Sequence, residues 1–353
     1  MNYQDELQNL ILTTAKEGAS DLHINVGRHP SLRISGSLVP LLKKPLVIPA
    51  YAEGVVSALL SAEQKEILIR EKELDFSYNF EDKARFRVNV YFQKSYYSAS
   101  LRLISVEIKT LEELNLPAIL KDFTRKEQGF FLVVGPTGHG KSTTLASMVD
   151  IINHEQTKHI VTIEDPIEYL FVQDQSIISQ REVGLDTSTF YKGLRAMFRQ
   201  DVDVAMIGEM RDPVTISTAV TAAETGHLIF SSLHTNSASQ TVFRIIDSFP
   251  ADQQPQISSQ LSSSLLGIFS QRLIPRISGG LVPAYELLIA NTAISNLIRE
   301  NRIHEIDIVI ETGSSEGMVS LNQSLLDLVR RGEISMESAM LYSSDSKSLK
   351  RLM

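Results

Sequence analysis

A glycine-rich segment that ends in Lys and Ser has the residue order of a phosphate-binding loop. Residues 135–142 read GPTGHGKS and fit the pattern G-x-x-x-x-G-K-[ST]. An apolar run at 129–134 predicts a strand before this segment, and residues 143–152 predict a helix after it. The glycines let backbone N–H groups surround a phosphate, and the start of the helix adds the positive end of its dipole. A chance glycine-rich turn is the alternative, but it would not require this strand–loop–helix context.

The side chains of the loop predict a site for ATP and Mg²⁺. Lys141 is expected to reach the β- and γ-phosphates, and the Ser142 hydroxyl is expected to bind Mg²⁺. The residues expected to contact the nucleotide are Gly135, Pro136, Thr137, Gly138, His139, Gly140, Lys141, Ser142 and Thr143.

Two carboxylates follow apolar segments whose carboxyl ends should meet at one edge of a sheet. Glu209 comes after the run 202–207 and is the predicted Walker B residue, which would hold the metal through water and also act as a base. Glu164 comes after the run 159–163 and is a second candidate for the base. The neighbouring Asp165 precedes Pro166, and capping of a turn is the alternative for it.

Two histidines and four arginines are further candidates. His227 and His234 flank the segment 228–232 and could sense the γ-phosphate, although a structural role is the usual one for a single His. Metal binding by the histidines is disfavoured, because no third ligand has suitable spacing. The candidate arginines are Arg87, Arg102, Arg195 and Arg199. Each of them alone would be an ordinary surface charge, but in a ring motor a mobile domain can supply arginines that stabilise developing phosphate charge.

The elements that must position these residues change character along the chain. Before about residue 110 the pattern predicts a small α+β domain, with helices near 7–11 and 52–69 and strands at 21–26, 31–42, 75–80, 85–92 and 98–104. After a linker at 111–120, strands at 129–134, 159–163, 202–207 and 228–232 alternate with helices. This alternation predicts an α/β domain at 121–353 with a largely parallel, doubly wound sheet. Three or four short helices are expected from about residue 291.

Composition sets outer limits on the function. The 353 residues are 43% apolar and 22% charged, as in an ordinary globular protein. No apolar run approaches the roughly 20 residues that span a bilayer, and the acidic start is unlike a secretory signal, so we expect a cytoplasmic protein. Cysteine is absent, which excludes disulfides and thiolate metal sites. The net charge of −8 argues against a nucleic-acid partner.

Several stretches taken together identify a family. The sequence resembles the PilT-type retraction ATPases of bacterial type IV pili, within the type II/IV secretion ATPase superfamily. The matching stretches are ASDLHI at 19–24 and RFRVN at 85–89 in the small domain, an Asp box TIEDPIE at 162–168, a Walker B region MIGEMRD at 206–212, and a His box over 226–235. The likeness covers nearly the whole chain.

The resemblance implies a RecA-like P-loop NTPase domain behind a PAS-like N-terminal domain. It implies a homohexamer that drives pilus retraction and twitching motility, with Arg87, Arg102, Arg195 and Arg199 at the family's nucleotide-site positions. It also implies an inner-membrane platform protein as partner, the accessory paralogue PilU as another, and a place at the cytoplasmic face of the inner membrane without direct membrane contact.

Two residues differ from the family pattern, and the absence of cysteine indicates which branch of the superfamily the sequence resembles. His139 stands where Ser is common in the loop, and Ser295 replaces an Arg in the stretch 293–300, which otherwise matches the family's retraction box AIRNLIRE. Assembly and type II secretion ATPases usually carry a tetracysteine zinc module, and the cysteine-free chain therefore favours the retraction branch. The alternatives are an assembly or accessory motor, a regulatory protein with a degenerate nucleotide site, and a ring helicase.

Overall fold

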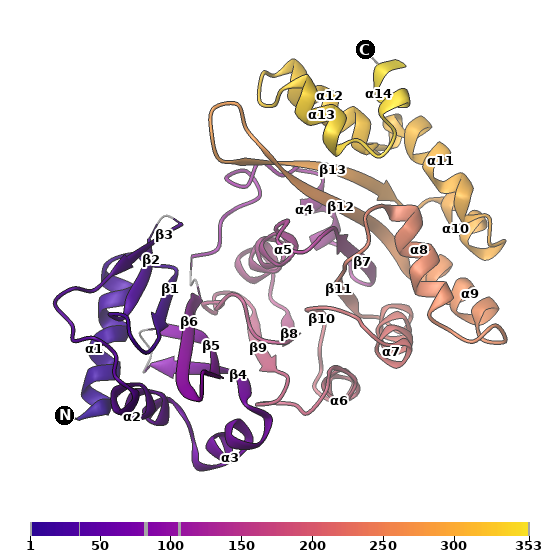
Figure 1. Cartoon of the computed structure of the whole chain (residues 1–353). Helices are drawn as coiled ribbons and strands as arrows, with labels where there is room; N and C mark the ends of the chain where they lie inside the picture. Colours follow the sequence, from indigo (N-terminus) through magenta and orange to yellow (C-terminus); the bar gives the residue numbers. More distant parts are fainter. Residues whose placement is uncertain (1, 35, 81–83, 105–106, 352–353) are drawn as a thin grey trace. The chain divides into compact units, whose positions relative to one another are not determined.

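The computed structural model describes residues 2–34, 36–80, 84–104 and 107–351, and these fall into two compact units, 1–106 and 107–353. Figure 1 shows the elements of both units. Ser35, within the strand expected at 31–42, lies outside the described residues.

The first unit is a six-stranded antiparallel sheet with helices. The sheet has the order β3-β2-β1-β6-β5-β4, and β4, β5 and β6 form the expected meander. Its elements are α1 (Tyr3–Lys16), β1 (Asp21–Ile24), β2 (Ser31–Ile34), β3 (Ser37–Pro40), α2 (Pro49–Leu59), α3 (Ala62–Glu71), β4 (Glu73–Phe80), β5 (Ala84–Gln93) and β6 (Tyr96–Ile104). Leu7, Leu10 and Ile11 of α1 are fully buried in its core, as their helical spacing predicts.

The prediction of a single helix over 52–69 was wrong. Leu60 has an extended backbone that ends α2, and Ser61 starts α3. The Ser61 hydroxyl accepts the Gln64 backbone N–H, and the Gln64 side chain accepts the Ser61 N–H. This reciprocal capping box stabilises a new helix start, which interrupts an otherwise continuous helical pattern.

The second unit is built on a seven-stranded sheet of order β13-β12-β7-β11-β10-β8-β9. All pairs are parallel except that of β12 with β13, which form an antiparallel hairpin. The strands are β7 (Gly129–Val134), β8 (His159–Glu164), β9 (Ile177–Glu182), β10 (Val204–Ile207), β11 (Leu228–Leu233), β12 (Leu265–Pro275) and β13 (Leu281–Ile289). The helix before the first strand is α4 (Leu120–Thr124), and those between the strands are α5 (Lys141–Glu155), α6 (Phe190–Met197), α7 (Pro213–Glu224), α8 (Ala238–Asp247) and α9 (Gln254–Ser264).

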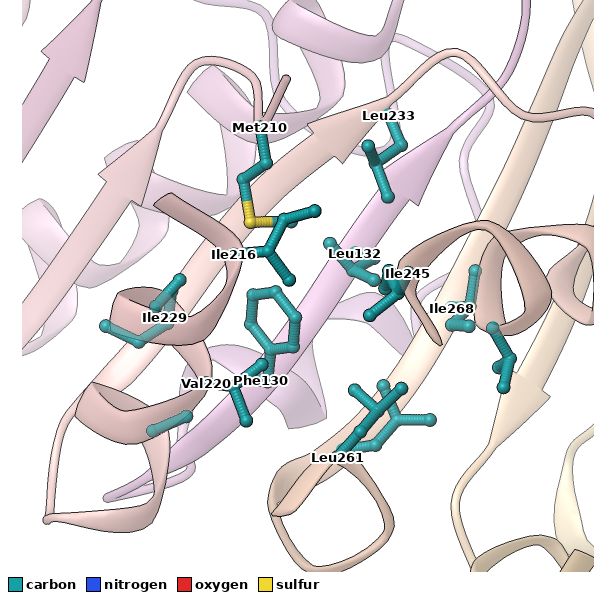
Figure 2. Packing of buried hydrophobic residues seen from close by; sticks show 14 of the residues in the cluster. Phe130, Leu132, Met210, Ile216, Val220, Ile229, Leu233, Ile245, Leu261 and Ile268 are labelled. Carbon is teal, nitrogen blue, oxygen red and sulfur yellow. The ribbon is translucent and has the colours of Figure 1, made fainter. Parts of the chain in front are cut away.

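Strand β7 is buried on both faces, which explains its continuous apolar sequence. Phe130 and Leu132 point into a cluster with helices α7, α8 and α9, and Phe131 and Val133 point into a second cluster with α5. Figure 2 shows the first cluster, where Phe130 and Leu132 lie among side chains of the neighbouring strands and helices. The alternation fixes the register of β7, so the loop after it leaves the sheet at a defined edge.

The chain ends in more short helices than predicted. Within the described residues these are α10 (Thr292–Arg299), η1 (Ile303–Glu305), α11 (Ile306–Thr312), η2 (Ser314–Glu316), α12 (Leu321–Arg330), α13 (Met336–Tyr342) and α14 (Ser346–Arg351). Leu325 and Leu349 pack with Ile274 and Val282 of the β12–β13 hairpin. The extra count arises because Gly313 ends α11, and Gly317 and Gly332, which both have positive φ, follow η2 and α12.

The stretch expected as a linker also contributes to this unit. Leu111, Leu116 and Leu120 are buried in the cluster that contains Phe131. The domain boundary near residue 110 stays a prediction.

None of the helices in the described ranges is long and apolar enough to cross a membrane.

Candidate nucleotide-binding site

The loop at 135–140 follows β7 directly, and Gln271 of the adjacent strand β12 packs against the glycines of this loop. A Cβ on Gly135 would lie 2.3 Å from the Gln271 carbonyl oxygen, and one on Gly140 would lie 2.9 Å from its side-chain nitrogen. Both glycines also have positive φ, at 147° and 80°. Thr144 donates to the Gln271 side-chain oxygen at 2.6 Å, so the start of α5 is tied to the same residue. Only glycine fits at these two points of the loop.

Lys141, the first residue of α5, is folded into the loop. Its side chain is buried, and its Nζ donates to the carbonyl oxygens of Gly135 and Pro136 at 2.9 and 3.0 Å. Burial lowers the pKa of Lys141, while the negative charges of Glu168 and Glu209 act in the opposite direction. The cation therefore lies beside the backbone N–H groups at the start of a long helix, the arrangement that attracts phosphate.

His234 connects this loop to the predicted Walker B carboxylate. Its Nδ1 lies 3.3 Å from the Lys141 Nζ and 3.2 Å from the Thr137 hydroxyl, and its Nε2 lies 3.2 Å from the Glu209 carboxylate. The ammonium group can only donate, so Nδ1 accepts and the ring proton belongs on Nε2, where it donates to Glu209. One imidazole thus joins the phosphate loop to an acid on the next strand of the sheet.

Glu209 follows β10 and is largely shielded from solvent, with a side-chain exposure of 15%. Besides His234 it pairs with Arg211 two residues later in the chain. The carboxylate is therefore held from two sides, by a ring N–H and by a guanidinium. Such an oxygen ligand can hold a divalent cation through water or orient a water molecule.

Glu164 ends the adjacent strand β8. Ile163 is in register with Ile207, and a Cβ on Gly208 would lie 3.5 Å from the Glu164 Cα, so Glu164 and Glu209 leave neighbouring strands at the same level. Burial raises the pKa of Glu164 to about 7, against hydrogen bonds from Thr162 at 2.6 Å, from the Glu168 backbone and from Gln180. Near neutral pH this carboxyl group exists in both protonation states, which suits a proton acceptor.

Several residues of the site escaped the sequence reasoning. Gln271 closes the loop, Gln180 supports Glu164, and Arg211 pairs with Glu209. The Tyr169 hydroxyl lies 2.8 Å from that of Thr143, next to the predicted magnesium ligand Ser142. Arg211 belongs to a recognised stretch and could have been chosen there. The other three carry no local signal, because they meet the site only through the sheet.

The structure does not bring His227 to the phosphate loop of the same unit. Its carbonyl accepts the Gly129 N–H at 3.0 Å, which places it where β7 begins, whereas His234 lies where β11 ends. The His227 ring instead meets the Phe198 ring edge to face, with centroids 5.5 Å apart. Arg199 follows Phe198 and Arg195 lies one turn earlier on α6, both exposed, so this pair also belongs to the region remote from the loop.

Arg87 and Arg102 belong to the first unit. They are directly opposite each other on β5 and β6, and both are exposed. The Arg102 Nε donates to Asp21 at 2.9 Å, and this carboxylate also lies near Arg33. Arg87 and Arg102 therefore form a pair of adjacent cations on one face of the sheet.

The residues of the site suit a magnesium ion that is held partly by the nucleotide better than a metal ion that is held by protein ligands alone. No group of three or more His, Asp or Glu able to hold a metal occurs among the described residues. Mg²⁺ usually takes one or two protein oxygens together with phosphate oxygens and water. Ser142 at the start of α5, and Glu209 through water, provide donors of this kind.

Comparisons of the sequence and of the structure with known proteins point to the same family. The profile of the family "Type II/IV secretion system protein" matches residues 4–280. The type IV pilus retraction ATPase PilT of Pseudomonas aeruginosa is 42% identical over 334 residues, which cover 95% of this chain and 97% of the relative. The type IV pilus ATPase PilU of the same organism is 38% identical over 98% of this chain and 90% of the relative. A crystal structure of the pilus retraction motor PilT with bound ADP superimposes with a TM-score of 0.91, at 45% identity, over 98% of both chains. The PAS-like and RecA-like fold expected from the sequence is confirmed by this similarity.

Proposed function

The chain belongs to the type II/IV secretion system protein family, and from this membership we propose that it is an ATP-hydrolysing motor that drives retraction of a type IV pilus. Two features support the proposal together. Its similarity to PilT extends over almost the full length of both proteins, and its second unit brings Lys141, His234 and Glu209 together beside the glycine-rich loop.

The observation that carries the activity is the chain of contacts from Lys141 through His234 to Glu209. Lys141 and the loop N–H groups would bind the β- and γ-phosphates of ATP. Mg²⁺, when bound at Ser142, would neutralise phosphate charge. Glu209 or Glu164 would orient the attacking water and accept its proton, and His234 would fix Glu209 relative to the loop.

Phosphate release by the purified full-length protein with Mg-ATP tests this activity. We expect Lys141→Ala to lower turnover by at least about 10²-fold, because it removes the cation built into the phosphate loop. Lys192→Ala removes an exposed lysine of α6 and is the matched control, expected to retain wild-type turnover. Equal turnover in both variants and the wild type would refute the site.

The assembly that we propose is a homohexameric ring in the cytoplasm, at the cytoplasmic face of the inner membrane. The ring would bind an inner-membrane platform protein and, as a further partner, the accessory paralogue PilU; nucleic acid is not an expected partner. In such a ring the arginines at 87, 102, 195 and 199, together with His227, could serve a nucleotide site to which several subunits contribute, since a cation that arrives on domain closure stabilises developing phosphate charge.

The cellular role has a direct test. Deletion of the gene should leave surplus surface pili without twitching motility if the motor retracts, and no pili if it assembles them. An accessory role is the second candidate, because the similarity to PilU also covers nearly the whole chain. In that case deletion should leave retraction active, and the protein should require a second motor.

A further inference from the structure

Glu286 lies outside every motif named above, yet its carboxylate contacts the start of a helix next to the site. It sits on β13, the edge strand of the second sheet. Its Oε1 accepts the backbone N–H of Ala238, the first residue of α8, at 2.7 Å. The first N–H groups of a helix have no partner within the helix, so this bond fixes the helix end to the hairpin.

The segment between this helix end and His234 is short and held at each step. Thr235 is buried and its hydroxyl lies 2.6 Å from that of Thr241. The carbonyl of Asn236 accepts the Ser270 hydroxyl of β12 at 3.1 Å. The position of Ala238 is therefore transmitted to His234 through residues that have little freedom of their own.

We propose that Glu286 is a positioning residue for His234, which fixes the start of α8 and so keeps the imidazole between Lys141 and Glu209. The inference rests on the proposed function, because it assigns Glu286 a role in the same site. Glu286 does not contact the phosphate loop, and its effect on hydrolysis passes through His234.

The groups that act on the charge of Glu286 come from several elements of the second unit. Burial raises the pKa of Glu286 to about 7, opposed by the Ala238 N–H, with Asp307 raising it further and Arg272 lowering it. Arg272 and Ser270 lie on β12, and Asp307 lies on α11, so the helix end, the hairpin and the C-terminal helices meet at this group.

Steady-state ATP hydrolysis by the full-length protein separates positioning from binding. We expect Glu286→Ala to lower kcat about tenfold and to leave the KM for ATP within about twofold, because Gln271 and the hydrogen bonds from the Lys141 Nζ to the loop carbonyls still hold the phosphate loop. Glu286→Gln keeps an acceptor oxygen for the Ala238 N–H and should restore most of kcat. The control Glu224→Ala removes a carboxylate that accepts hydrogen bonds from Gln260 and Ser263 of α9, away from the site, and should change neither constant.

A double-mutant cycle shows whether the effect passes through His234. If it does, Glu286→Ala should cost nothing further once His234→Ala is present. An additive loss in the double variant, or a rise in KM equal to the fall in kcat, would overturn the proposal and leave Glu286 as a purely structural residue.

Histidine side-chain NMR on labelled full-length protein gives a readout independent of turnover. The resonance that disappears in His234→Ala identifies this ring, and it should shift in Glu286→Ala but not in Glu224→Ala. An unchanged resonance would refute the positioning role even if the protein hydrolysed ATP. If the resonance shifts in Glu286→Ala but the wild-type protein does not hydrolyse ATP, the proposed function alone is refuted.

Discussion

The two ends of strand β11 carry the same residue type in very different surroundings. His234, where the strand ends, contacts Lys141 and Glu209. His227, where it begins, donates from its ring to the Ala222 carbonyl at 3.1 Å and packs on Phe198. All neighbours of β11 run parallel to it, so every strand–helix loop that carries a candidate group opens at the end of His234. Residue type alone therefore says little, whereas the direction of the strand decides which histidine can meet a nucleotide bound by the same subunit.

The largest expected effect lies at the carboxyl end of the sheet. Glu209→Gln keeps the shape of the side chain but removes its basicity, and should lower kcat by about 10²- to 10⁴-fold if the role is that of a base. Nucleotide binding, measured by titration with labelled ADP, should remain close to wild type. If Glu209→Gln turns over normally while Glu164→Gln does not, the roles of the two carboxylates are reversed.

The two histidines provide the direct test of the comparison. His234→Ala should lower kcat about 10- to 100-fold, because the loop and Glu209 lose the group that aligns them. His227→Ala should change the turnover of each active site by no more than about twofold if it acts only as a packed residue. A large loss in His227→Ala with unchanged thermal stability would instead indicate that the opposite end contributes to a neighbouring subunit's site.

The buried carboxyl group of Glu164 predicts a pH-dependent stability difference. Its pKa rises from 4.5 to about 7 on folding, so the folded state binds the proton more tightly and loses stability as pH rises from about 4.5 to 7. Glu164→Gln resembles the protonated form and should be more stable than wild type by up to about 3 kcal/mol at pH 8, with the gain vanishing near pH 4. Urea unfolding of both proteins at several pH values measures this difference. A constant difference across the range would mean that Glu164 ionises normally.

The smallest effect on hydrolysis is expected on α10, where Ile294, Leu297 and Ile298 are buried and Arg299 and Glu300 are exposed. Because the polar pair touches none of the candidate site residues, Arg299→Ala or Glu300→Ala should retain most ATPase activity and lose pilus retraction. Ser295→Arg, which restores the family residue, should preserve or increase retraction. Phosphate release in vitro and twitching assays in cells measure the two effects. Parallel loss of both activities in the alanine variants would make this helix merely structural.

The sequence by itself determined what short-range patterns encode. The continuous apolar run of β7 and the loop that follows it predicted a phosphate site, and the structure places Lys141 and the glycines of that loop together. The alternation of strands and helices predicted the parallel sheet, and the spacing of Leu7, Leu10 and Ile11 predicted a buried helix face. The spacing signals lie within about two turns or one strand, where spacing alone fixes which side chains share a face, and the alternation of elements is a succession of such short signals.

Only the tertiary structure decided which residues distant in the sequence form hydrogen bonds around the site. Gln271 meets Thr144 across 127 residues of sequence, and Glu286 meets Ala238 across 48. No periodic pattern marks such pairs, since the folding of the sheet rather than the local backbone brings them within hydrogen-bonding distance. The same reason explains why the sequence treated His227 and His234 alike. Only the assembled parallel sheet places one beside Lys141 and the other at the opposite edge.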